Sequence, residues 1–135
     1  FMGVKVALKE TFEINASSGS GQDLGDGVGK FLHRIHRTRQ VLGDELPIQN
    51  SLIALDILNS VAIAHFSGLK LSVKGLMASL PHSPAGLRYH YARLLEEGWI
   101  LTHQDAGDAR IRWVKPTERL LASYEKVLAA SRDLR

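Results

Sequence analysis

The fold is decided by residues 72–117, SVKGLMASLPHSPAGLRYHYARLLEEGWILTHQDAGDARIRWVKPT. The first part of this stretch predicts a short helix over residues 73–80. Ser72 is a good N-cap, because its side-chain oxygen can accept a hydrogen bond from a free N–H of the first helical turn. Pro81 ends the helix, since the residue before a proline disfavours helical backbone angles.

The second part of the stretch predicts a longer helix and a hairpin. Ser83 caps the helix with Pro84 at its first position, and Gly98 ends it. Two strands follow, over residues 99–103 and 111–114. This order of elements, a short helix, a turn, a longer helix and a hairpin, is typical of a winged helix-turn-helix. The second helix of that motif enters the DNA major groove. The predicted fold class is therefore mainly α (α+β), with a two-stranded wing.

Helical spacing gives the longer helix a buried face and an outward face. Leu87, Tyr91 and Leu94 share the inward stripe, at about 100° per residue. The residues predicted to point away from the core are Ala85, Arg88, Tyr89, Ala92 and Glu96. Among these, Arg88 can form paired hydrogen bonds to guanine, and Tyr89 can contact a phosphate or a thymine methyl group.

Other polar residues around this helix are candidates for contacts with the DNA backbone. The helix start at Ser83 and Pro84 suits a phosphate oxygen, and Arg93 is predicted to contact the backbone from the second half of the helix. In the hairpin, arginines can enter a narrow minor groove, and Asp108 lies where it could orient one of them. The predicted DNA-binding residues are Ser83, Pro84, Arg88, Tyr89, Arg93, Arg110 and Arg112.

Helices are also predicted on both sides of residues 72–117. A densely apolar segment over residues 48–66 predicts a central core helix. Amphipathic helices are predicted over residues 28–42 and 117–134. The apolar stripe of the first is Val28, Phe31, Leu32, Ile35 and Leu42, and that of the second is Leu120, Leu121, Tyr124 and Leu128, with Val127 as a further candidate. The stripe of the first helix needs a partner, on this chain or on a second copy.

The N-terminal residues 1–27 are predicted to form an arm and a linker. Apolar residues at period two over 4–14 predict a strand, and the Gly/Ser/Asp-rich residues 17–29 predict a flexible linker. The chain is therefore divided into an arm with its linker, residues 1–27, and a winged-helix domain with its flanking helices, residues 28–135.

Composition narrows the class of protein. The chain has 17 Lys and Arg residues and 14 Asp and Glu residues, which gives a net charge of +3. It has no cysteine, and this excludes disulfides and thiolate metal sites. No apolar run is long enough to cross a bilayer, so a cytoplasmic protein is expected. His33 and His36 lie three apart on a strongly basic helix, which disfavours a bound cation. No nucleophile, base and acid have a catalytic spacing, so neither an enzyme nor a cofactor is predicted.

The region from Leu46 to Leu121 resembles the winged-helix domain of MarR-type transcriptional regulators. The resemblance rests on LPIQNSLIALDIL, SVKGLMASLPHSPAGLRYHYARLLEEGWI and GDARIRWVKPTER, the last of which carries the Asp-x-Arg wing pattern as Asp108 and Arg110. It implies a dimeric repressor or activator whose first and last helices, over 28–42 and 117–134, interlock two subunits. It also implies that two recognition helices read a near-palindrome, with DNA contacts at Ser83, Pro84, Arg88, Tyr89 and Arg110. The sequence does not identify an effector.

Two functions remain open at this point. The first is sequence-specific binding of double-stranded DNA by a homodimer. The second is a winged-helix module that binds a protein partner without specific DNA binding, since the net charge is modest and the arm could add a strand to a partner. The feature that separates them is whether the arginines of the recognition helix and of the wing form one positive face.

Overall fold

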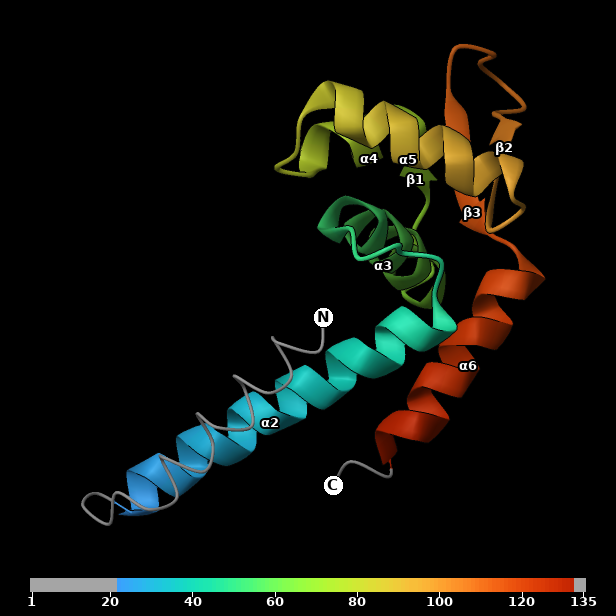
Figure 1. The fold of residues 1–135 in the computed structure, drawn as a ribbon. Helices are drawn as coiled ribbons and strands as arrows, with labels where there is room; N and C mark the ends of the chain where they lie inside the picture. Colours follow the sequence, from blue (N-terminus) through green and yellow to red (C-terminus); the bar gives the residue numbers. More distant parts are fainter. Residues whose placement is uncertain (1–21, 133–135) are drawn as a thin grey trace. The chain divides into compact units, whose positions relative to one another are not determined.

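The computed structural model describes residues 22–132, which form five helices and one small antiparallel sheet (Figure 1). The elements are α2 (Gln22–Glu45), α3 (Leu52–Phe66), β1 (Leu71–Ser72), α4 (Val73–Ser79), α5 (Pro84–Glu96), β2 (Ile100–Gln104), β3 (Arg112–Pro116) and α6 (Glu118–Arg132). The chain divides into two compact units between Gln40 and Val41. The predicted arm, residues 1–16, lies outside the described residues.

The second unit is built around α3. This helix packs against α4, α5 and β3, and β3 lies between β1 and β2 in the sheet. The side chains that are almost completely buried are Ile57, Leu58, Val61, Leu76, Leu94, Ile100 and Leu120, from α3, α4, α5, β2 and α6. Every element of the helix-turn-helix and of the wing therefore contributes to one core, which holds α5 in a fixed orientation.

The first unit contains α2 up to Gln40. The helix begins at Gln22 and not near residue 28, so the prediction of a flexible linker was wrong for residues 22–27. Glycines in this segment weaken a helix by about 1 kcal/mol each, but extending an existing helix adds one hydrogen bond per residue. At the other end, α2 continues past residue 42, where the predicted helix ends, to Glu45.

The connection into α3 also differs from the prediction. Residues 48–51 were predicted as helical, whereas α3 begins at Leu52 with Ser51 as its N-cap. Gln49 and Asn50 have φ angles of 50° and 58°, in the left-handed region. This turn leaves Ile48 outside the helix but directs its side chain into the core, where it is 5% exposed.

The sheet has one strand more than predicted. Trp113 and Val114 of β3 pair with Ser72 and Leu71 of β1. The other edge of β3 pairs with β2, from Pro116 opposite Ile100 to Arg112 opposite Gln104. The two residues of β1 are too few for a periodic pattern, and Ser72 also serves as the N-cap of α4. The short strand ties the start of the helix-turn-helix to the base of the wing.

The last helix, α6, begins one residue after Thr117, whose Oγ1 accepts a hydrogen bond from the backbone N–H of Leu120 at 3.3 Å. Leu120 and Val127 are buried, whereas Leu128, another member of the predicted apolar stripe, is 54% exposed on this chain. Residues 133 and 134 of the predicted helix lie outside the described residues.

Candidate nucleic-acid interface

Helix α5 begins where the sequence predicted, after Ser83 and with Pro84 in its first turn. Ser83 is the N-cap, and its Oγ accepts a hydrogen bond from the backbone N–H of Gly86 at 3.1 Å. Pro84 occupies the first helical turn. At the other end the chain turns at Gly98 with a φ of 79°, a conformation that glycine adopts without a steric cost.

The outward face of α5 is the predicted one. Leu87 and Leu94 are buried, and Tyr91 is half-buried against the core. The five exposed residues of the opposite face are Ala85, Arg88, Tyr89, Ala92 and Glu96. Arg88 makes no hydrogen bond or ion pair with any residue in 22–132, and the Tyr89 side chain is 63% exposed. Both side chains can therefore reach a ligand outside the protein.

Gly86 lies on the side of α5 that packs against α3. In the structure a Cβ added at Gly86 would lie 2.7 Å from Cδ1 of Ile53, so the glycine allows α5 to pack closely on α3. Ala85, its exposed neighbour, is the small residue that leaves room on the outward side.

Arg93 belongs to the inner side of α5. Its guanidinium donates to the carbonyl of Pro47 at 2.9 Å and to the carboxylate of Glu97 at 2.8 Å, and the side chain is 13% exposed. It also lies 3.5 Å from Nδ1 of His90, whose Nε2 lies 3.2 Å from Oγ of Ser51. Burial, with a smaller contribution from the charge of Arg93, lowers the pKa of His90. These contacts tie α5 to the turn before α3 and argue against the DNA contact predicted for Arg93.

Replacing Arg93 with methionine is therefore expected to lower the free energy of unfolding by about 1–3 kcal/mol. The substitution keeps an apolar stem but leaves the Pro47 carbonyl without the donor that now meets it. Urea unfolding followed by circular dichroism measures the effect. The matched control is Arg88→Met on the exposed face of the same helix, which should change the stability by less than about 0.5 kcal/mol. Equal effects of the two substitutions would contradict the placement of Arg93.

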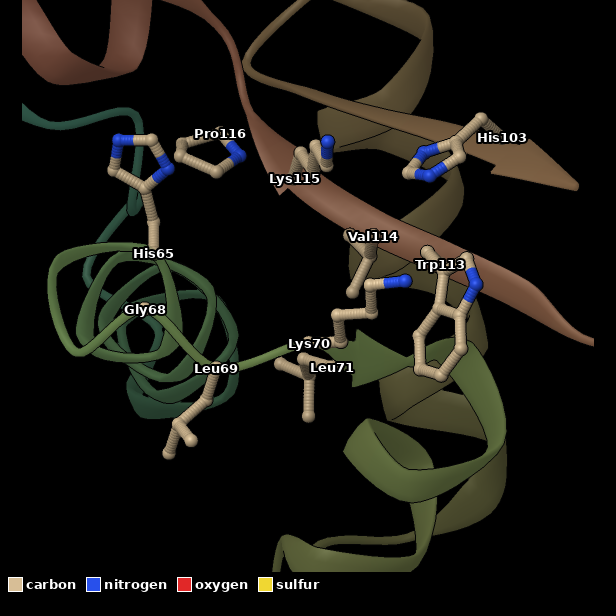
Figure 2. Close-up of a pocket in the computed structure, with 10 residues that line it drawn as sticks. All are labelled: His65, Gly68, Leu69, Lys70, Leu71, His103, Trp113, Val114, Lys115 and Pro116. Atoms are coloured by element: carbon tan, nitrogen blue, oxygen red, sulfur yellow. The ribbon is translucent and has the colours of Figure 1, made fainter. Parts of the chain in front are cut away.

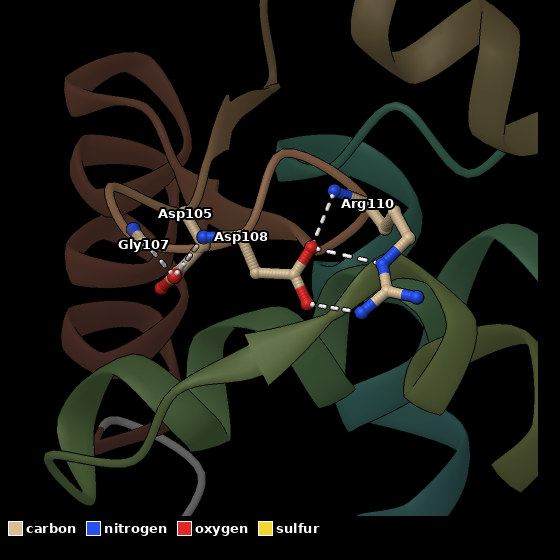
Figure 3. A network of polar contacts seen from close by, with 4 residues as sticks. All are labelled: Asp105, Gly107, Asp108 and Arg110. Atoms are coloured by element: carbon tan, nitrogen blue, oxygen red, sulfur yellow. Dashed lines mark hydrogen bonds and ion pairs between the residues drawn. The ribbon is translucent and has the colours of Figure 1, made fainter.

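The wing is organised by two aspartates (Figure 3). Asp105 Oδ2 accepts hydrogen bonds from the backbone N–H groups of Gly107 and Asp108, each at 3.0 Å, and its Oδ1 accepts one from Nε1 of Trp113 at 2.9 Å. Asp108 binds the guanidinium of Arg110 through both carboxylate oxygens at 3.1 Å. The predicted pairing of Asp108 with a wing arginine is confirmed, and the Arg110 side chain is held in place while 90% exposed.

Asp105 was not identified as a functional residue from the sequence. An aspartate two residues before a glycine is typical of a turn in which the carboxylate accepts backbone N–H groups, so a signal was present in DAGD. The contact with Trp113 was not predictable, because it depends on how β2 and β3 pair.

Arg112 lies on β3, where its guanidinium donates to Oγ1 of Thr102 on β2 at 3.2 Å. Burial raises the pKa of Tyr91 on α5, and the nearby charge of Arg112 opposes that rise. Arg112, at the base of the wing, is therefore near enough to Tyr91 of the recognition helix for its charge to act on that side chain.

The wing is expected to keep its hydrogen bonds down to acid pH. Hydrogen bonding from Trp113 lowers the pKa of Asp105, and hydrogen bonding from Arg110 lowers that of Asp108, both below the ordinary 3.8. A depressed carboxyl pKa stabilises the fold above the unfolded value, and this contribution is lost as the pH falls through the folded value. The NMR signal of the Trp113 indole N–H should therefore titrate only below pH 3.8. A midpoint at or above that pH, or an unchanged titration in Asp105→Asn, would contradict this account.

No group of three or more His, Asp or Glu side chains that could hold a metal ion occurs within the described part of the chain. Among residues 22–132, no helix has both the length and the apolar character needed to cross a membrane. The features that bear on function are therefore the outward face of α5, its capped N-terminus and the wing arginines.

Comparison with known proteins places this geometry in a known fold. No protein-family model and no curated protein sequence matches the chain. Among solved structures, the transcriptional regulator Tm0710 from Thermotoga maritima superposes with a TM-score of 0.57 at 19% identity, over 76% of this chain and 67% of that one. AbsC, a MarR family transcriptional regulator from Streptomyces coelicolor, gives 0.54 at 14% identity, over 87% of this chain and 76% of that one.

A MarR variant from E. coli complexed with operator DNA also superposes on the chain. Its TM-score is 0.53 at 21% identity, and the match covers 87% of this chain and 82% of the other. At these identities the similarity is one of fold. The chain has the winged-helix fold of MarR-type transcriptional regulators, and the resemblance seen in its sequence is confirmed at that level.

Proposed function

We propose that this protein is a transcriptional regulator that binds a specific double-stranded DNA sequence as a homodimer. The observation that carries the proposal is α5, which presents Arg88 and Tyr89 to solvent from a winged-helix scaffold shared with a MarR variant complexed with operator DNA. The protein would act by binding and not by catalysis. A cytoplasmic location remains a prediction.

The proposed DNA contacts follow from the geometry of each side chain. Arg88 and Tyr89 are assigned to base edges and the neighbouring backbone in the major groove. Ser83 and Pro84 lie at the exposed N-terminus of α5, where the Ser83 hydroxyl can donate to a phosphate and the helix dipole favours a negative charge. Arg110 and Arg112 are assigned to the DNA beside the wing. Arg93 is left out of this set because it is bound to Pro47 and Glu97.

Arg110 is well prepared for such a contact. The bidentate ion pair with Asp108 fixes its guanidinium plane, and the arginine has five N–H donors, of which the pair uses two. The remaining donors face solvent and can bind a phosphate or a minor-groove acceptor. A side chain that is already ordered loses less conformational entropy on binding than a free one.

Titration of a fluorescent duplex, followed by anisotropy at several salt concentrations, tests the proposal. Each phosphate contact made by a lysine or arginine adds about 0.9 to the slope of log K against log salt. In a homodimer Arg110→Ala removes two such contacts, so it should reduce the slope by about 2, whereas Arg93→Met should leave it unchanged. Absence of salt-dependent binding to any duplex, together with capture of a protein partner, would favour the protein-interaction module instead.

The homodimer is supported by exposed apolar side chains on α2. On α2 the side chains of Val28, Phe31, Leu32 and Ile35 form one stripe and are between 45% and 57% exposed. An amphipathic helix gains stability from burying such a stripe, and a contiguous exposed one is typical of an interaction site. We assign its partner to the same region of a second copy, because two-fold symmetric dimers are the commonest oligomers of soluble proteins.

A further inference from the structure

A cavity of about 230 Å³ lies between the C-terminal end of α3, the segment leading into β1, and the sheet (Figure 2). It lies within the second compact unit and apart from the outward face of α5. Its volume equals that of roughly eight water molecules, and it is smaller than the ~300–1,000 Å³ pockets that hold drug-sized ligands. A ligand that fills it must therefore be small.

The polar lining of the cavity is basic. His65 from the end of α3, Lys70 from the segment before β1, His103 from β2 and Lys115 from β3 contribute to its wall, and no acidic residue does. Hydrogen bonds from Trp113 and from two backbone N–H groups, with a smaller contribution from the charge of Lys70, lower the pKa of Asp105, which lies outside the lining. With both imidazoles neutral, the two lysines give the lining a formal charge of +2.

The rest of the wall is apolar. Leu69, Leu71 and Pro116 line the cavity beside the lysines, and the indole of Trp113 forms one side. The Lys70 ammonium lies over the Trp113 ring at 5.3 Å from its centroid, so a cation–π contact holds this charge at the cavity (Figure 2). The cavity thus combines positioned cations with a surface that can cover a flat apolar group.

We propose that this cavity binds a small phosphomonoester that carries a flat apolar group. A phosphomonoester has a charge of about −1.5 to −2 near pH 7, which matches the two lysines, and three terminal oxygens, which can accept from lysine and histidine together. The apolar group would lie against the leucines and Pro116. This binding is independent of DNA, so its failure leaves the proposed function untouched.

Phenyl phosphate is a suitable probe, and the protein carries its own reporter. The chain has two tryptophans, Trp113 in the cavity wall and Trp99, whose ring lies under the Arg119 guanidinium at 3.9 Å. In the NMR spectrum of the full chain, phenyl phosphate is expected to shift the Trp113 indole N–H signal saturably and to leave that of Trp99 unchanged. Trp113→Phe removes the first signal and assigns it.

Three small molecules test the class of ligand. Inorganic phosphate lacks the ring, benzyl alcohol lacks the charge, and benzoate carries one negative charge. Each is expected to bind at least about tenfold more weakly than phenyl phosphate, a difference equivalent to one good charged contact or the burial of a ring. Binding of any of the three as tightly as phenyl phosphate would overturn the proposed class.

Two substitutions test the site. Lys115→Gln is expected to weaken phenyl phosphate binding about tenfold, because it removes one of the two lining charges without disturbing Trp113. The matched control is Lys126→Gln on the exposed surface of α6, which should have no effect. The proposal is wrong if phenyl phosphate gives no saturable shift up to about 10 mM, or if both substitutions weaken binding equally.

Discussion

Replacing Arg88 with alanine is expected to reduce discrimination between a preferred duplex and a random one by about 1–3 kcal/mol in each half-site, so by about 2–6 kcal/mol for the homodimer, roughly 30-fold or more. Arg88 is exposed, its side chain makes no hydrogen bond or ion pair with residues 22–132, and it lies on the face of α5 opposite the buried Leu87 and Leu94. An arginine in that position can donate two parallel hydrogen bonds to guanine. Alanine removes both bonds, while the other proposed backbone contacts still hold the protein on any sequence.

Competition titrations with the preferred and the random duplex measure this loss. Arg88→Lys keeps the charge but lacks the planar pair of donors, so it should lose most of the discrimination while retaining affinity for random DNA. The control is Arg132→Ala, which removes one exposed arginine from α6. If Arg88→Ala weakens binding to both duplexes equally, Arg88 contacts only phosphate, and the assignment to a base edge is wrong.

Replacing Ile35 with glutamate is expected to convert the dimer into a monomer. Burial of one isoleucine side chain contributes roughly 1.5–3 kcal/mol, and a two-fold axis counts the residue twice. The loss of about 3–6 kcal/mol raises the dimer dissociation constant more than about 100-fold, before the cost of placing a carboxylate in an apolar interface. Sedimentation velocity over a range of protein concentrations measures the change directly.

The matched control is Arg37→Glu, on the same helix and about half a turn away from the apolar stripe. It introduces the same side chain on the polar face and should leave the dimer intact. DNA affinity is expected to fall in Ile35→Glu, because a monomer can occupy only one half-site. A monomeric wild-type chain, or equal behaviour of the two variants, would show that the α2 stripe is not a dimer interface.

Local signals explain why the recognition helix could be predicted from the sequence. Ser83 and Pro84 mark the start of α5, Gly98 marks its end, and the spacing of Leu87 and Leu94 sets its buried face. Each of these depends on residues within one helix and its caps. The outward position of Arg88 follows directly from that spacing, and the structure confirms it.

The features that sequence could not give depend on contacts between distant segments. Arg93 is bound to the carbonyl of Pro47, and Gly86 is packed against Ile53, two contacts that only the docking of α5 on α3 creates. The strand β1 exists because β3 offers it an edge. The position of Arg93 in the second half of the helix led to the prediction of a DNA backbone contact. Only the tertiary contacts show that its guanidinium is already bound within the protein.

Selection from a random pool of duplex DNA tests the central claim most directly. The full chain would be incubated with the pool, and bound duplexes would be recovered and sequenced over several rounds. The account predicts enrichment of a near-palindromic sequence with a guanine in each half-site, and loss of preference for that guanine in Arg88→Ala. A pool that stays random after repeated selection with folded wild-type protein would contradict it.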